Sequence, residues 1–96
     1  MAFGDVTRAI EGPEYTLADA DHHVMLTFAN ACAITVPAAL PDDFACGWEQ
    51  QGDEPITFVP GHGVTFTSRT GRISSIHAGS SGGIHAKGDE FRLIGI

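Results

Sequence analysis

Long hydrophobic runs are missing from this chain. No stretch approaches the roughly 18 consecutive apolar residues that a membrane-spanning helix needs. The opening segment, MAFGDVTRAIEGPE, also lacks the apolar core of a secretory signal peptide. We therefore expect a soluble protein that is made in the cytoplasm and has no membrane partner.

Basic residues are scarce too. The chain carries 5 Lys and Arg against 12 Asp and Glu, which gives a formal net charge of -7. Nucleic acid is not an expected partner, because neutralising its phosphates requires a basic patch. The acidic surface favours solubility, and it equally suits docking on a basic partner.

Cysteine is limited to Cys32 and Cys46, too few for a disulfide framework. Each lies among apolar residues, so we expect buried free thiols rather than a bridge. A domain of this size buries only about 60% of its unfolded surface. Its core is therefore expected to be thin, and association with other copies becomes the favoured source of extra stability.

Uninterrupted helical patterns are also lacking, because 12 Gly and 5 Pro punctuate the chain. What remains is a series of short runs with β-type composition. The predicted strands cover residues 15–17, 23–28, 33–36, 46–50, 56–59, 64–67, 73–76, 84–86 and 90–94.

Apolar and polar residues alternate within these runs. The side chains expected on the inner faces are Cys32, Ile34 and Val36, then Ile56 and Phe58, Val64 and Phe66, and Phe91 and Leu93, with Ile94 as a further candidate. The pattern predicts an all-β fold, a single small antiparallel β-sandwich or barrel. We assign this domain to residues 15–96 and an N-terminal arm to residues 1–14. The arm could be a helical turn, an edge strand, an extended segment on a neighbouring subunit, or a frayed terminus.

Several motifs follow one another in a specific order. They are Tyr15-Thr16-Leu17 with Asp19 and Asp21, Ile34-Thr35-Val36-Pro37, Phe44, Trp48-Glu49-Gln50-Gln51-Gly52, Ile56-Thr57-Phe58, Gly61-His62-Gly63-Val64-Thr65-Phe66, and Lys87-Gly88-Asp89-Glu90-Phe91-Arg92-Leu93-Ile94-Gly95. Across residues 15–95 this order resembles a β-module of tailed-bacteriophage head-decoration, head-fibre and tail-fibre proteins.

The resemblance implies a compact, non-catalytic β-sandwich or barrel that associates as a homotrimer in the virion, after assembly in the host cytoplasm. A short chain without a long fibrous shaft favours a capsid decoration, cement or head-fibre protein that contacts the major capsid protein. The alternative is a tail-fibre or tail-tip module, attached to tail proteins, that binds host glycans. It predicts that aromatic residues such as Trp48 or Tyr15 are exposed.

Some of these positions have a physical explanation. Gly61 and Gly63 flank His62, where we expect a tight hairpin between two strands. Gly88 and Asp89 are expected to form the turn between the last two strands. The amide of Gln50 is placed to satisfy backbone groups of a neighbouring loop.

The five histidines, His22, His23, His62, His77 and His85, invite a metal hypothesis, but none has a recognised ligand spacing. His22 and His23 should point to opposite faces of a strand. A threefold axis could still gather three copies of one histidine around an ion. We predict no metal and no cofactor.

Catalytic signatures are weak. Ser80 and Ser81 lie near His77 only along a Gly/Ser-rich loop, and Cys32 and Cys46 are in β-core contexts. We predict no catalytic residues and no enzymatic activity.

Apolar residues are expected to be left over once the small core is filled. Val24, Leu26 and Phe28 share one face of a strand, and Met25 lies on the other. Ile73 and Ile76 cannot share a face without a bulge. A subunit interface would remove the surplus from water at about 25 cal/mol per Å². A monomer with scattered exposed apolar residues is the alternative.

Overall fold

The computed structural model describes residues 6–68, 71, 73–75, 78–87 and 90–96. The protein is all-β, with 54% of the described residues in strands and 4% in helix. Its elements in chain order are β1 (Val6–Ile10), β2 (Glu14–Thr16), the 3-10 turn η1 (Asp19–Asp21), β3 (Val24–Phe28), β4 (Cys32–Val36), β5 (Ala45–Gln50), β6 (Ile56–Pro60), β7 (Thr65–Ser68), β8 (Ser81–Lys87) and β9 (Glu90–Ile94).

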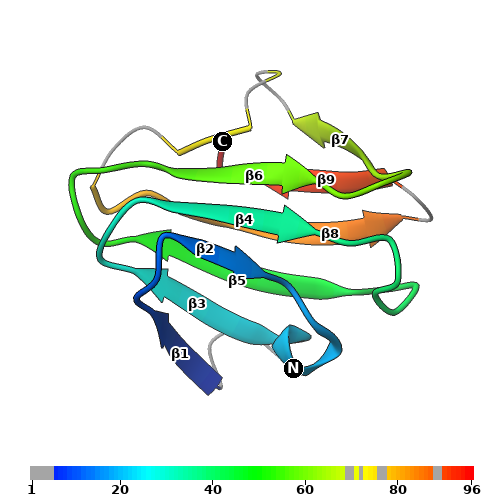
Figure 1. Cartoon of the computed structure of the whole chain (residues 1–96), viewed down its shortest axis with the longest axis horizontal. Coiled ribbons are helices and arrows are strands. Elements are labelled where there is room, and N and C mark those ends of the chain that lie inside the picture. Colours follow the sequence, from blue (N-terminus) through cyan, green and yellow to red (C-terminus); the bar gives the residue numbers. More distant parts are fainter. Residues whose placement is uncertain (1–5, 69–70, 72, 76–77, 88–89) are drawn as a thin grey trace.

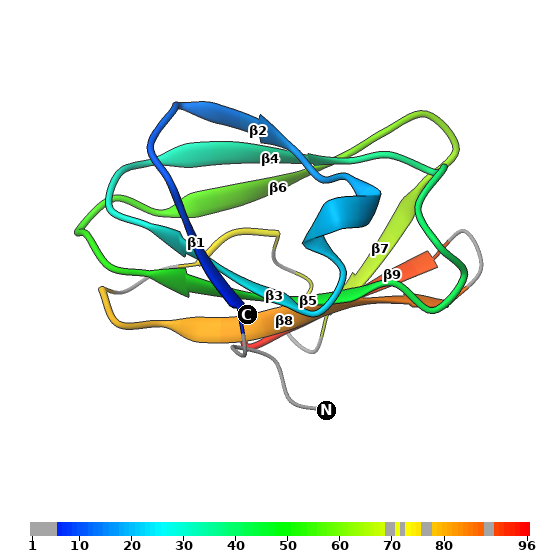
Figure 2. The ribbon, with the colours of Figure 1, turned by 90° about the horizontal axis from the view of Figure 1, so that it is seen from below.

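The chain winds into a β-solenoid of about 4 turns. Successive strands alternate between two sheets, so β1, β3 and β5 stack in parallel in one sheet and β2, β4 and β6 stack in parallel in the other. Figure 2 shows the two sheets as facing layers. The six-stranded sheet has the order β1-β3-β5-β8-β9-β7, and the three-stranded sheet has the order β2-β4-β6 (Figure 1).

The C-terminal hairpin interrupts this winding. Strand β8 pairs antiparallel with both β5 and β9, and β9 pairs parallel with β7. The hairpin is thus inserted between the third and fourth turns of the six-stranded sheet. The antiparallel pairing expected of the last two strands is confirmed, whereas Gly88 and Asp89 lie outside the described residues.

The predicted antiparallel sandwich or barrel is wrong: the sheets are mostly parallel. Alternation shows which side chains of a strand are buried, but it carries no information on the direction of the neighbouring strand. In this chain most short turns lead to a strand of the facing sheet, whereas a hairpin would return the chain to the same sheet.

The connection around His62 illustrates the error. Strand β6 belongs to the three-stranded sheet and β7 to the six-stranded sheet, so no hairpin joins them. The Gly61 N–H donates to the Val36 carbonyl oxygen at 2.9 Å. A Cβ at Gly61 would lie 2.8 Å from that oxygen. Glycine is needed here because the turn approaches the coil beneath it.

Most predicted strands form, with end shifts of a few residues, but the strand predicted at 73–76 does not. Ile73, Ser74 and Ser75 run beside β6 instead, with one antiparallel bridge between Ser74 and Thr57. Ile76 lies outside the described residues. Within the predicted N-terminal arm (residues 1–14), residues 6–10 form an edge strand parallel to β3, which is one of the four alternatives considered for the arm.

The core lies between the two sheets. Its largest fully buried side chains are Trp48, Phe28, Phe44, Phe58 and Phe91. The predicted inner faces are confirmed for Cys32, Ile34 and Val36, for Ile56 and Phe58, for Val64, and for Phe91 and Leu93. Phe66 is half-buried, and Ile94 is 49% exposed on the opposite face of β9.

Candidate functional site

A buried carboxylate joins the first elements of the chain. Asp21 is fully buried in η1 and accepts hydrogen bonds from the Tyr15 hydroxyl at 2.8 and 2.9 Å and from the Ala18 N–H at 2.9 Å. It also forms an ion pair with Arg8 of β1. Burial, followed by the hydrogen bond to Asp21, raises the pKa of Tyr15. The cluster fastens β1 and β2 to η1.

A second polar cluster joins later elements. The Gln50 amide donates to the Gly52 carbonyl at 2.8 Å, which confirms the role predicted for this side chain. The Ser75 hydroxyl hydrogen-bonds to the Gln50 amide oxygen. It also accepts from the Ile56 N–H at 2.9 Å. Both side chains are buried, and they fix the segment beside β6 to β5.

His22 and His23 are not arranged as predicted. They precede β3, and His23 has a φ of 65°, so the pair lies in a turn rather than on opposite faces of a strand. Their rings stack with centroids 3.8 Å apart. The Ala45 N–H donates to Nδ1 of His22 at 3.1 Å, and the His23 N–H donates to the Ala45 carbonyl at 2.7 Å. These contacts attach the turn to β5.

The other two described histidines do not join them. His62 and His85 are both exposed, in a turn and on β8, and His77 lies outside the described residues. Within the part of the chain that the structure describes, no three His, Cys, Asp or Glu side chains are grouped to hold a metal ion.

Both thiols are buried and free, as predicted. Burial, with a smaller effect from the charge of Asp21, raises the pKa of Cys46 to about 12. Burial also raises the pKa of Cys32. A thiol attacks as its thiolate, so Cys46 is unreactive at neutral pH. Ser81 is the first residue of β8 and Ser80 precedes it, and their expected neighbour His77 is outside the described residues.

Of the two aromatic residues considered for glycan stacking, Trp48 is buried and Tyr15 is half-buried. Trp48 is 1% exposed and packs edge-on against Phe58, with ring centroids 6.1 Å apart. The Tyr15 hydroxyl is bonded to Asp21. Trp48 therefore does not offer the exposed aromatic surface that the glycan-binding alternative predicts, whereas the ring of Tyr15 is half-buried.

The apolar residues nominated for an interface are mostly buried within one chain. Val24, Leu26 and Phe28 all face the core. Among the described residues, the large hydrophobic side chains left exposed are Val59 (38%), Ile73 (42%) and Ile94 (49%). Fewer apolar side chains are therefore left exposed than the sequence predicted. Of the residues predicted to be left over, Ile73 is exposed, whereas Val24, Leu26 and Phe28 are buried.

Strand register brings together a surface that sequence reasoning missed. We define the outer face as the side of the six-stranded sheet turned away from the three-stranded sheet. Met25, Gly47, Gly83 and Ile94 are in register across β3, β5, β8 and β9 on this face. Only the pairing of strands reveals this row, although the alternation Phe91–Leu93 in β9 does place Ile94 opposite the core.

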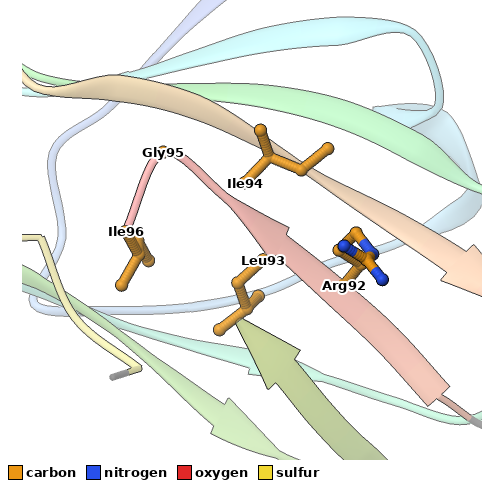
Figure 3. A pocket seen from close by; sticks show the side chains of 5 residues that line it. All are labelled: Arg92, Leu93, Ile94, Gly95 and Ile96. Atoms are coloured by element: carbon orange, nitrogen blue, oxygen red, sulfur yellow. The ribbon is translucent and has the colours of Figure 1, made fainter. Parts of the chain in front are cut away.

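Pockets are found on the part of the chain that the structure describes. One of about 330 Å³ is lined by Arg92, Leu93, Ile94, Gly95 and Ile96 (Figure 3). Another, of about 290 Å³, is lined by Pro13, Ala31, Cys32, Ala33, Pro55 and Thr57, which come from three successive coils. The first adjoins the outer face through Arg92 and Ile94.

Comparisons with known protein families, curated proteins and solved structures found no match. Among the described residues, no helix has the length and apolar character required to cross a membrane.

Proposed function

We propose that this chain is a non-catalytic structural protein of a tailed-phage particle, working as a homotrimer on the capsid surface as a decoration, cement or head-fibre protein. The order of motifs over residues 15–95 supports this proposal by its resemblance to such proteins. The placement of buried polar side chains in the fold supports the proposal independently.

The two buried polar clusters hold neighbouring coils together. Asp21 joins β1, β2 and η1, while Gln50 and Ser75 join β5 to the segment beside β6. Hydrogen bonds to a charged group contribute about 1.5–3 kcal/mol each. Such side chains stiffen a short solenoid, which suits a protein that serves as a rigid part of an assembly.

The solution mass of the purified chain tests the assembly. Light scattering coupled to size exclusion should give three times the mass of the 10.1 kDa chain. Electron microscopy of particles after addition of the protein should then show density at threefold or quasi-threefold positions of the shell. A monomer at all concentrations overturns the trimer, and binding confined to the tail overturns the capsid location.

A further inference from the structure

A guanidinium and two neutral polar groups lie side by side on the outer face. Arg92 of β9 is in register with His85 of β8 on one side and with Thr67 of β7 on the other. All three side chains point away from the core, because the alternate residues Phe91 and Leu93 of β9 are buried. Neighbouring strands of a sheet are about 4.8 Å apart. The three side chains therefore leave the sheet next to one another.

The guanidinium of Arg92 has no counterion within the described part of the chain. The ion pair there is between Arg8 and Asp21, and Arg92 makes neither an ion pair nor a hydrogen bond. Its side chain is exposed and lines the 330 Å³ pocket at the end of β9 (Figure 3). Glu90, on the same face of β9, lies directly opposite Lys87. The N–H donors of Arg92 are thus available to a ligand.

The Thr67 hydroxyl beside this cation is unsatisfied. Its Oγ1 atom is buried and has no hydrogen-bond partner. A buried polar atom costs free energy unless a protein group, an ordered water or an ion satisfies it. Among the described residues, Nε1 of Trp48 is in the same condition, but that atom belongs to a core ring packed against Phe58. The position of Thr67 next to a guanidinium favours a negatively charged acceptor for its hydroxyl.

We propose that Arg92, Thr67 and His85 form a binding site for one oxyanion, a carboxylate or a phosphate group. A guanidinium presents a planar fork of N–H donors that fits two oxygens of such a group. The Thr67 hydroxyl donates to the anion from the β7 side, and the N–H of a neutral imidazole donates from the β8 side. The Arg92 side chain is long and exposed, so it can turn to admit the anion.

Two substitutions test the site against a matched cation on the same face. Inorganic phosphate and acetate are titrated separately into the full chain at constant ionic strength, with chloride as the balancing ion. The amide resonances of residues 65–68 and 90–94 are followed by NMR. Arg92→Gln should raise the dissociation constant by about tenfold or more, because it removes a charged hydrogen-bond donor. Lys87→Gln should change it by less than about twofold, since salt screens a charge that does not contact the anion.

Thr67→Val gives a second readout that leaves the charge unchanged. Without the anion, its thermal unfolding midpoint should equal or exceed that of the wild type, because a methyl group of similar shape replaces an unsatisfied hydroxyl. With the anion present, the wild type should gain more stability than the variant, since a ligand stabilises the fold according to its affinity. A variant that is less stable than the wild type without the anion would mean that the protein already satisfies the hydroxyl, and Thr67 would not belong to the site.

The two probes also distinguish the source of the oxyanion. Saturable binding of acetate alone supports a carboxylate ligand, and binding of phosphate alone supports a phosphate ligand. If Arg92→Gln and Lys87→Gln weaken binding equally, the anion responds only to the net charge of the face, and the proposed site is wrong. Absence of saturable binding of both anions also overturns it. The inference goes beyond the proposed function, because none of these results depends on whether the chain forms a trimer.

Discussion

At the scale of single residues, burial of the Cys46 thiol makes stability depend on pH. Its pKa is about 12 in the fold, against 9.0 for an unperturbed thiol. The unfolded chain therefore loses this proton first. The stability tied to the protonated thiol is complete below about pH 9 and is lost as the pH rises towards 12. The expected loss is about 1.4 kcal/mol per pH unit within this window.

Denaturant unfolding at a series of alkaline pH values measures this slope. Cys46→Ala should be less stable than the wild type at pH 7, because it leaves a cavity, yet its stability should fall less steeply between about pH 9 and 12. Cys32→Ala serves as the comparison: burial raises the pKa of Cys32 too, but this side chain borders the 290 Å³ pocket and is less enclosed, so its removal should reduce the slope less than removal of Cys46. If the slope of stability against pH is the same in Cys46→Ala as in the wild type, the alkaline loss does not come from the Cys46 thiol. The raised pKa of Tyr15 adds an alkaline loss of the same sign in all three proteins.

At the scale of elements, the turn after β6 depends on a glycine that touches the coil beneath it. Gly61→Ala should lower the free energy of unfolding by about 1–3 kcal/mol, because its Cβ would lie 2.8 Å from the Val36 oxygen and 3.1 Å from the Pro37 Cα. At Gly12 the nearest atom is 3.6 Å away, so Gly12→Ala should change stability by less than about 1 kcal/mol. Equal urea midpoints for the two variants would refute the explanation.

The elements also show how far the sequence alone could lead. Local alternation predicted the strands and their buried faces, since a side chain such as Ile34 or Phe58 is buried whatever the direction of its neighbour. Parallel pairing was not predictable, because it depends on where each turn leads. The row from Met25 to Ile94 joins residues from four strands, so it exists only once their register is known. The same holds for Asp21, whose partners Arg8 and Tyr15 lie in two different strands.

At the scale of the whole molecule, a solenoid in which each coil contacts only its neighbours should open from its ends. In the six-stranded sheet β1 and β7 are edges, while β3, β5, β8 and β9 are interior. Native-state hydrogen exchange should therefore show the strongest amide protection in the interior strands.

Asp21→Asn removes the charge that binds Arg8 of β1 and the Tyr15 hydroxyl of β2. It should lower protection in β1 by about tenfold or more, since hydrogen bonds to charged groups contribute about 1.5–3 kcal/mol, and change β8 and β9 little. His85→Ala, at an exposed position on β8, is the control. An equal fall in β1 and β8 would mean that the molecule opens as one cooperative unit, and the picture of coils fastened one to the next by local polar clusters would fail.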